Sequence, residues 1–315
     1  MRQNFTDVLN KLGIMVIDGA MATELEAIGC DLNDELWSAK ILAENPELIK
    51  KVHISYFKAG ADCSTSASYQ ATVPGFIKKG FTKEQAEQLI TDSVKILISA
   101  RDKWWESEGK NSGRVMPIVS AAVGPYGAFL ADGSEYRGNY NISKEELKAF
   151  HKGRIELLWN AGSDILAVET IPSLDEALII AEIVKELNAK CWISFSCKNN
   201  TDISEGTKIK DCAKALSFYD CVEAIGINCT APEFVPSLIK EAKAGGTKPV
   251  VVYPNSGEIY DAVTKTWHGR GDGRTYGSMA SEWIDCGATI IGGCCRTTPE
   301  NIKEVRQVVD KKLNK

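Results

Sequence analysis

The sequence predicts an α/β fold, a (β/α)8 TIM barrel that forms a single domain over residues 1–315. Eight short apolar runs alternate with amphipathic segments, and this number of strand and helix units fits the length of one barrel. The runs lack strict alternation of apolar and polar residues, which is typical of parallel strands buried on both faces. A doubly wound open sheet gives the same pattern and remains the alternative.

The expected strands cover residues 14–18, 61–66, 117–124, 164–169, 191–196, 224–229, 249–254 and 288–294. The expected helices carry apolar residues at helical spacing and cover residues 46–59, 83–105, 144–160, 173–188, 211–219, 231–244 and 299–313. Asn45 before Pro46 and Thr298 before Pro299 are typical helix starts, because a capping residue precedes a proline. Two longer connections, at residues 124–141 and 255–276, are rich in Gly, Tyr and charge, as active-site loops often are.

Composition and charge exclude several classes of protein. The 37 basic and 42 acidic residues give a net charge of −5, which argues against a nucleic-acid or membrane-surface partner. No apolar run approaches the roughly 18 residues that span a bilayer. The N-terminal segment lacks the apolar core of a signal peptide, so we expect a cytoplasmic protein.

The ten cysteines are unusual for a chain of this kind, and a reducing cytoplasm would keep them as thiols. Most should be small buried core residues. We expect this of the five that lie in or beside strand and helix patterns, namely Cys191, Cys197, Cys212, Cys221 and Cys286. Cys30 in a loop and Cys63 on the second strand have no evident metal partner.

Three cysteines end strands, where barrel enzymes place their catalytic groups. Cys229 ends the sixth strand, and Cys294 and Cys295 end the eighth. Three converging thiolates suit Zn²⁺, which prefers sulfur and tetrahedral geometry, and they leave the open fourth position of a catalytic site. Gly292 and Gly293 would allow close approach of backbone and ligand. The alternative is that these cysteines, too, are ordinary core residues.

Two carboxylates, Asp18 and Glu169, end the first and fourth strands. Because a carboxylate is costly to bury without a partner, we predict that they bind a substrate ammonium group. Alternatively, Asp18 caps the following turn and Glu169 pairs internally. Of the three histidines, His53 and His151 fall within predicted helices and are expected to be structural, whereas His268 in the second long loop could approach the site. The Gly-rich segment 269–273 does not lie between a strand and a helix, so it is no dinucleotide motif, and we interpret it as a mobile loop.

Nine segments, which cover nearly the whole chain in order, resemble the homocysteine S-methyltransferases that use S-methylmethionine or S-adenosylmethionine. They are DGAMATELE (18–26), LWSAKIL (36–42), NPELIKKVHISYFKAGAD (45–62), SYQATVPGF (68–76), GPYGAFLADGSEYRGNY (124–140), ETIPSLDEA (169–177), GINCTAPEF (226–234), VYPNSGEIYD (252–261) and GGCCRTTPENI (292–302). The resemblance implies a catalytic zinc bound by three cysteines, which match Cys229, Cys294 and Cys295. It also implies that Asp18 and Glu169 hold the homocysteine amino group.

The resemblance further implies that Ser66, Thr170 and the backbone near Met21 complete the amino-acid pocket. Betaine-using relatives are expected to carry an aromatic residue after the glutamate, where this chain has Thr170, so betaine is disfavoured as donor. The implied partners are homocysteine and a sulfonium methyl donor, and the product is methionine. Because the length leaves no room for a cobalamin or folate module after the barrel, we do not expect a multidomain methionine synthase. We also expect the protein to be a monomer.

The expected chemistry needs little from the protein beyond positioning. Once the methyl group has moved to the acceptor, the rest of the sulfonium donor leaves as a neutral thioether. Loop aromatic residues could bind the sulfonium through cation–π contacts or simply pack within the loops; they are Tyr126, Tyr136, Tyr140, Tyr260 and Trp267. A selenocysteine or selenohomocysteine acceptor and a non-catalytic or redox-sensing zinc barrel remain alternatives. A zinc hydrolase would instead require histidine ligands and a carboxylate base.

Overall fold

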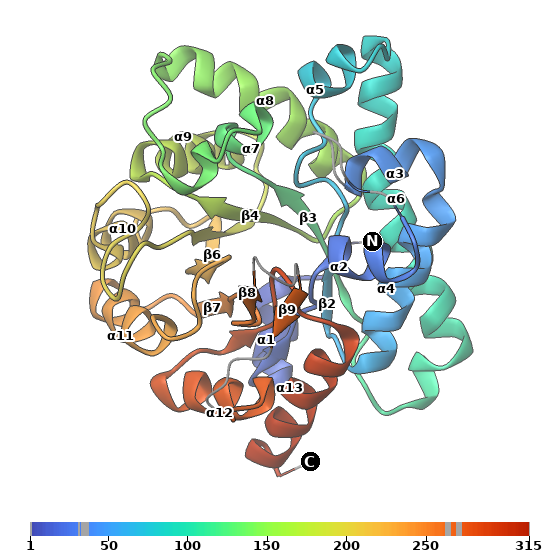
Figure 1. Ribbon diagram of the computed structural model, residues 1–315, viewed down its shortest axis with the longest axis vertical. Helices are drawn as coiled ribbons and strands as arrows, with labels where there is room; N and C mark the ends of the chain where they lie inside the picture. Colours follow the sequence, from blue (N-terminus) through green and yellow to red (C-terminus); the bar gives the residue numbers. More distant parts are fainter. Residues whose placement is uncertain (1, 31, 33–37, 262–265, 269–272, 315) are drawn as a thin grey trace.

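The computed structural model describes residues 2–30, 32, 38–261, 266–268 and 273–314. Its parallel strands form a ring surrounded by helices, which confirms the predicted (β/α)8 barrel and excludes the open sheet (Figure 1). The order of hydrogen-bonded strands is β1-β10-β7-β6-β5-β4-β3-β2. A parallel bridge between Ile17 and Cys63 joins the first and last of these strands, so the ring closes.

All eight predicted strands are present, with ends that differ by a few residues. They are β1 (Met15–Val16), β2 (Cys63–Thr65), β3 (Ile118–Val123), β4 (Ile165–Ile171), β5 (Cys191–Phe195), β6 (Val222–Asn228), β7 (Val250–Tyr253) and β10 (Ile290–Ile291). The predicted connection 255–276 contains a further antiparallel hairpin, formed by β8 (Ile259–Asp261) and β9 (Thr266–His268). Residues 269–272 of the predicted mobile loop lie outside the described residues, as do the side chains of Tyr260, Trp267 and His268.

The seven predicted helices are confirmed as α4 (Pro46–Ala59), α6 (Lys83–Ser107), α8 (Lys144–Asn160), α9 (Leu174–Glu186), α10 (Ile209–Leu216), α11 (Val235–Gly245) and α13 (Pro299–Lys312). Asn45 precedes α4 without the expected side-chain cap. The sequence patterns missed α1 (Phe5–Leu12), α2 (Met21–Ala27), α3 (Ser38–Glu44), α5 (Val73–Lys78), α7 (Tyr126–Leu130), α12 (Tyr276–Cys286) and the short 3₁₀ turns η1 (Gly109–Asn111) and η2 (Ser134–Tyr136). No helix of the described residues is long and apolar enough to span a membrane.

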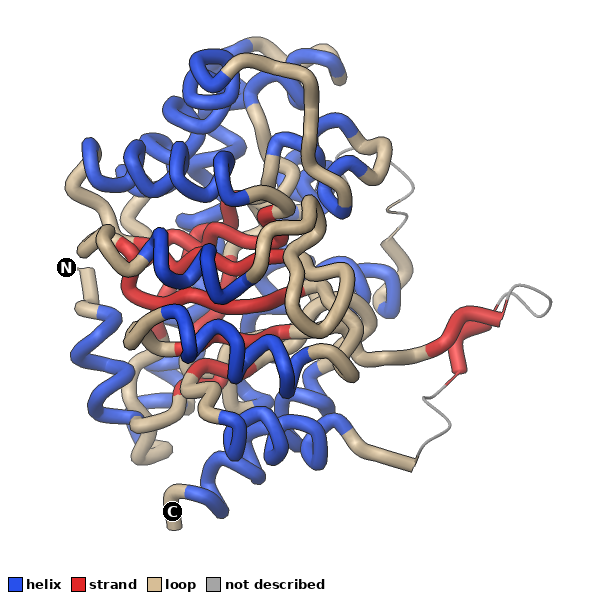
Figure 2. The backbone as a smooth tube through the Cα atoms, turned by 90° about the vertical axis from the view of Figure 1, so that its left-hand side faces the viewer, coloured by secondary structure: helices blue, strands red, loops and turns tan. Residues whose placement is uncertain are grey.

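The barrel interior is filled by apolar side chains near the amino ends of the strands. Residues such as Met15, Ile118, Ile165 and Trp192 form this inner core together with the apolar face of α1. Figure 2 shows α1 at one end of the barrel and the β8–β9 hairpin beyond the other. Because the amino end is plugged, the carboxyl ends of the strands form the accessible mouth, where barrel enzymes carry their sites.

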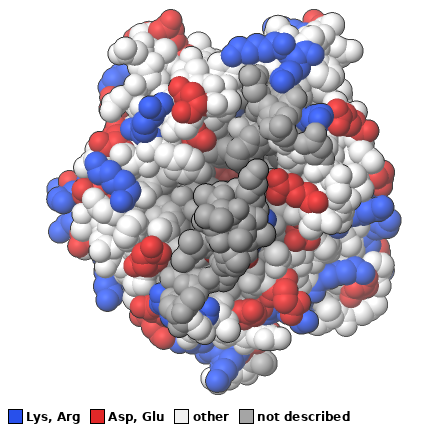
Figure 3. All heavy atoms as spheres, viewed as in Figure 1, with Lys and Arg blue, Asp and Glu red and all other residues white. Residues whose placement is uncertain are grey.

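Charged residues of both signs are interspersed around the face that carries the mouth (Figure 3). Neither sign forms a broad continuous patch among the described residues on this face.

Buried Asp62 joins the strand starts at the plugged end of the barrel. Its Oδ2 accepts hydrogen bonds from Val16 N at 3.0 Å and from an Arg306 nitrogen at 2.8 Å. Its Oδ1 lies 3.3 Å from Arg114 Nη2. One carboxylate thus connects β1 to two arginines, so it should be central to the stability of the closure.

Replacing this carboxylate should destabilise the fold. We predict that Asp62→Ala lowers the free energy of unfolding, measured in urea, by about 3–5 kcal/mol, since the arginines lose a buried partner. Asp92 on α6, whose side chain is 39% exposed, provides a matched control, for which Asp92→Ala should cost less than about 0.5 kcal/mol. Equal effects of the two substitutions would contradict the role assigned to Asp62.

Candidate active site

Three cysteine sulfurs converge at the mouth of the barrel. Cys229 directly follows β6, and Cys294 and Cys295 follow β10. All three Sγ atoms lie within 4.8 Å of one another, and those of Cys229 and Cys295 are 3.9 Å apart. The structure therefore brings together the residues predicted from the strand ends, in an arrangement that could hold a metal ion.

The oxidation state differs from the expected set of three thiols, because Cys229 and Cys294 form a disulfide. The same convergence that allows sulfurs to share a metal also brings two of them within bonding distance. Metal binding requires deprotonated, reduced sulfurs, so the reduced form is the one that could bind an ion. Burial raises the pKa of the Cys295 thiol, and the nearby charge of Glu169 adds to the effect. A metal cation would offset both influences, which suits this donor set.

The end of β7 holds both cysteine segments in place. Cys229 N donates to Tyr253 O at 3.3 Å, and Cys294 N donates to the next carbonyl, Pro254 O, at 2.8 Å. Ser256 N donates to Cys295 O at 3.0 Å. Since β7 lies between β6 and β10 in the sheet, its carboxyl end connects the two sources of sulfur.

The two glycines before the cysteines permit the close approach that the sequence predicted. A Cβ atom on Gly292 would lie 2.7 Å from Asp18 O, and one on Gly293 would lie 2.6 Å from Thr297 Cβ. Gly293 N donates to Asp18 O at 3.0 Å. Any larger residue would push the cysteine segment away from the end of β1.

Asn228 fixes two residues with unusual backbone geometry. Thr170 has a φ of 60° and Cys229 a φ of 46°, in the left-handed region that non-glycine residues rarely adopt. The buried Asn228 side chain accepts a hydrogen bond from Thr170 N and donates one to Thr170 Oγ1, both at 2.7 Å. Such strained positions cluster at functional sites when the surrounding structure determines them. Asn228 thereby positions Glu169, which directly precedes Thr170, and it is itself directly followed by Cys229.

Asp18 is buried beside the cysteine segment. One carboxylate oxygen accepts hydrogen bonds from Ser64 Oγ and, at 2.9 Å, from Thr65 N. Burial raises the pKa of Asp18 to about 7 despite these bonds. His53 lies behind Ser64, with Nδ1 at 3.1 Å from Ser64 Oγ, and burial lowers its pKa to about 3. The histidine is therefore neutral and supports Asp18 from within the protein, in line with the structural role expected for it.

Glu169 faces the barrel interior above the inner core and is bonded to the Tyr253 hydroxyl. Burial, together with the charge of Asp18, raises the pKa of Glu169 to about 8. The two carboxyls are thus close enough to repel each other when ionised. A cation bound to both would lower both pKa values, which is what an ammonium ligand provides.

The other predicted pocket residues lie around this pair. Met21 begins α2 directly after the β1 end, and Thr170 is held by Asn228. Ser66 Oγ lies 2.7 Å from Ser68 Oγ and accepts from Ala122 N at 3.3 Å, so its hydroxyl joins the ends of β2 and β3. Direct contact of these residues with a substrate remains a prediction.

Two of the loop aromatic residues, Tyr126 and Tyr140, pack within the loop after β3. Buried Glu176 accepts hydrogen bonds from Tyr126 N at 2.7 Å and Tyr140 Oη at 3.0 Å, and it lies 2.8 Å from His151 Nε2. The Tyr126 and Tyr140 rings also pack together, with centroids 5.3 Å apart. These two tyrosines therefore pack at the base of the loop. Tyr136 differs: 46% of this residue is exposed, and partial burial together with the nearby Cys295 raises the pKa of its hydroxyl.

Sequence reasoning placed Asn228 at a strand end that faces the mouth, without a role of its own, and it did not single out Tyr69 or Glu135. Tyr69 bonds to the Thr170 side chain, and its pKa is raised by burial and by nearby Tyr136, Glu135 and Glu169. Tyr69 and Glu135 fall within segments that carry the family resemblance, and this was the one feature of the sequence that could have indicated a functional role for them.

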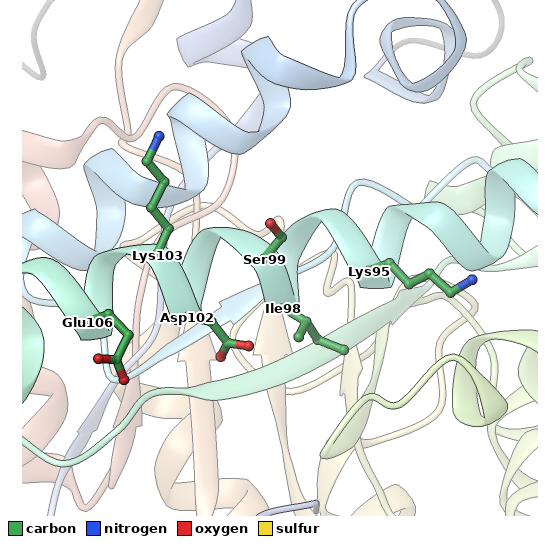
Figure 4. A pocket seen from close by; sticks show the side chains of 6 residues that line it. All are labelled: Lys95, Ile98, Ser99, Asp102, Lys103 and Glu106. Carbon is green, nitrogen blue, oxygen red and sulfur yellow. The ribbon is translucent and has the colours of Figure 1, made fainter.

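A groove of about 520 Å³ along α6 is unrelated to this site. Its lining side chains, which include Lys95, Asp102 and Glu106, come from one helix and point in different directions (Figure 4). Lys95 and Glu106 also form short-range ion pairs with their helix neighbours. The convergent polar groups that define a binding site lie at the mouth instead.

Comparison with known proteins identifies the class to which this barrel belongs. The chain is 54% identical over 299 residues to homocysteine S-methyltransferase YbgG of Bacillus subtilis, covering 95% of each chain. It is 46% identical to the homocysteine S-methyltransferase of Escherichia coli over 95% of this chain and 96% of that one. The crystal structure of the E. coli homocysteine methyltransferase MmuM in its metallated form matches 96% of this chain and 98% of that one, with a TM-score of 0.84 and 43% identity. An oxidized form of the same protein also matches, with a TM-score of 0.85.

The protein is thus a methyltransferase built on a (β/α)8 barrel. The family model described as homocysteine S-methyltransferase matches residues 15–309, and the chain belongs to that family. The resemblance recognised in the sequence is therefore confirmed over almost the whole chain.

Ammonium binding by Asp18 and Glu169 should depend on pH. Burial keeps these carboxyls largely protonated in the free protein at pH 6, and an ammonium ligand requires them ionised. We predict that L-methionine, which has no thiol to titrate, binds roughly a hundredfold more tightly at about pH 7.5 than at about pH 6, with proton release detected by calorimetry in two buffers. Asp18→Asn should weaken binding and flatten this dependence. Affinity independent of pH in the unmodified protein would contradict the assignment.

Proposed function

We propose that this protein transfers a methyl group from a sulfonium donor, S-methylmethionine or S-adenosylmethionine, to the thiol of L-homocysteine, giving methionine, with zinc as its metal. The observation that carries the proposal is the convergence of three cysteine sulfurs within 4.8 Å beside two carboxyls, those of buried Asp18 and partly buried Glu169. A sulfur-rich metal site is suited to a thiol substrate, and the carboxyl pair is suited to the amino group of an amino acid.

The donor set fits zinc. Three cysteine thiolates are soft ligands that favour this metal, and three protein ligands correspond to a catalytic rather than a structural site. Cys229, Cys294 and Cys295 would hold the ion in their reduced state. When bound, zinc supplies an open coordination position for a substrate thiol and lowers the pKa of that thiol.

The protein's own residues orient the acceptor. Asp18 and Glu169 bind the homocysteine ammonium group, which directs the side chain and its sulfur toward the cysteines. The Asn228 side chain holds Thr170 in its left-handed backbone conformation, and Cys229 follows Asn228 directly in the chain, so the carboxyl and sulfur positions stay fixed relative to each other. This alignment supplies the proximity on which a displacement between two bound amino acids depends.

The donor places few demands on acid–base chemistry. The methyl group leaves a positively charged sulfur, and the leaving group is a neutral thioether that needs no proton. Both histidines within the described helices, His53 and His151, are buried with lowered pKa values, consistent with this absence of a general acid. We further infer that the enzyme works as a monomer in the cytoplasm, where the cysteines are kept reduced.

A redox-sensing barrel without catalysis is the rival favoured by one observation, the disulfide between Cys229 and Cys294. The two proposals differ in what they require of Cys295, which lies outside the disulfide. A metal site needs all three sulfurs, whereas the disulfide needs only two.

Substitution of Cys295 therefore tests the proposal. The reduced enzyme should contain about one zinc per chain and methylate homocysteine, and Cys295→Ala should lose both properties, because two thiolates leave the shell incomplete. Metal content is measured by mass spectrometry, and transfer is measured with S-methylmethionine. Cys286 lies at the end of helix α12 and not at a strand end, so Cys286→Ala should retain both zinc and activity. Full zinc and turnover in Cys295→Ala would refute the ligand assignment.

A further inference from the structure

Glu135 carries an unusual buried carboxylate oxygen. Its Oε2 atom is shielded from solvent and has no hydrogen-bond partner. Among the buried side-chain atoms of the described residues that share this condition, it is the only carboxylate oxygen. Buried acceptors without donors are rare in proteins because they lose their hydration without compensation. Such an atom calls for a ligand that brings a donor.

The backbone around Glu135 is fixed, so this side chain is held at the mouth. Glu135 belongs to η2 in the loop after β3, and its carbonyl oxygen accepts a hydrogen bond from Ser196 Oγ at 3.1 Å, just beyond β5. The loop packs tightly on itself, since a Cβ on Gly127 would lie 2.6 Å from the Ser134 carbonyl carbon. Glu176 anchors the beginning and the end of the same loop through Tyr126 and Tyr140.

Packing of η2 against β4 places Glu135 near the end of the strand that carries Glu169 and Thr170. The nearby charge of Glu135 contributes to the raised pKa of both Tyr69 and Tyr136. Tyr136 also interacts with Cys295, and Tyr69 also interacts with Glu169. Glu135 therefore lies on the side of the mouth that carries the acceptor pocket, near the predicted metal ligand Cys295.

Glu135 is nevertheless separate from the carboxyl pair that serves the acceptor. The charge of Asp18 acts on Glu169, whereas the side-chain charges that act on Glu135 are those of Asp132 and Arg137. The reaction brings two amino acids to the mouth, and the pair provides for only one ammonium group. A third carboxylate near the sulfurs is thus available for the second.

The chemistry of the orphan oxygen distinguishes between the two cationic groups of the donor. A sulfonium has no N–H and cannot donate a conventional hydrogen bond, whereas an ammonium group has three donors. We propose that Glu135 binds the α-ammonium group of the sulfonium methyl donor through Oε2. This inference rests on the proposed function and adds the residue that selects amino-acid donors.

The test compares donors with and without an amino group on the reduced, zinc-loaded enzyme. Glu135→Gln preserves size and removes the charge, and it should raise the KM for S-methylmethionine by about 10-fold to 100-fold. The KM for homocysteine and the zinc content should remain close to the wild-type values, which also shows that the variant folds. Exposed Glu145 on α8 supplies the control, since Glu145→Gln should change none of these quantities.

Dimethylsulfoniopropionate, a sulfonium without an amino group, serves as the second probe. Its inhibition constant against S-methylmethionine should be the same for wild type and Glu135→Gln, because it lacks the group that Glu135 binds. An equal weakening of both sulfonium compounds would show a general charge effect and overturn the ammonium assignment. An unchanged KM for S-methylmethionine, or a raised KM for homocysteine instead, would also overturn it.

Failure of the proposed function has a different signature. If the zinc-loaded wild type transferred no methyl group, the function would be wrong whatever Glu135 does. Calorimetric binding of S-methylmethionine to wild type and to Glu135→Gln then tests the site independently of turnover. Equal affinities of the two proteins would refute the role of Glu135.

Discussion

The convergence of three cysteine sulfurs at one rim of the barrel is the constraint on which the rest of the site depends. Parallel strands carry their carboxyl ends to the same edge, so residues 65 positions apart in sequence can meet there. Cys229 and Cys294 come from strands separated by β7, and they donate to consecutive carbonyls at the β7 end. The geometry of the cluster is thus set by backbone hydrogen bonds, and the glycines at 292 and 293 allow the second segment to reach it.

The acidic groups of the site share one electrostatic property, which is that each favours a bound cation. Asp18, Glu169 and Cys295 each have a raised pKa because burial disfavours their charged forms. Each cost is relieved by a cation: the proposed site would hold a metal ion, and the two proposed substrates bring two ammonium groups and a sulfonium. A site that holds its acids largely protonated when empty and ionises them around cationic ligands couples binding to proton release.

Much of the fold was predictable from the sequence because parallel strands buried on both faces leave a clear apolar signal. The residues that end those strands could be placed at the mouth for the same reason, so the sequence alone predicted that Cys229, Cys294, Cys295, Asp18 and Glu169 lie together. Helix α1 was missed because its role, closing the amino end of the barrel, depends on contacts with strands far along the chain. The role of Asn228 and the isolation of Glu135 Oε2 depend on hydrogen bonds, or their absence, between distant segments. The disulfide could not be predicted, since strand ends indicate proximity and not oxidation state.

The central claim, that three cysteine sulfurs form a metal site open to a thiol substrate, is tested most directly by X-ray absorption at the zinc edge of the reduced, zinc-loaded enzyme. The account predicts a first shell of about three sulfurs and one lighter atom, which becomes about four sulfurs when homocysteine is added. A shell that contains histidine nitrogen in place of one cysteine sulfur, or that does not change with homocysteine, would contradict it.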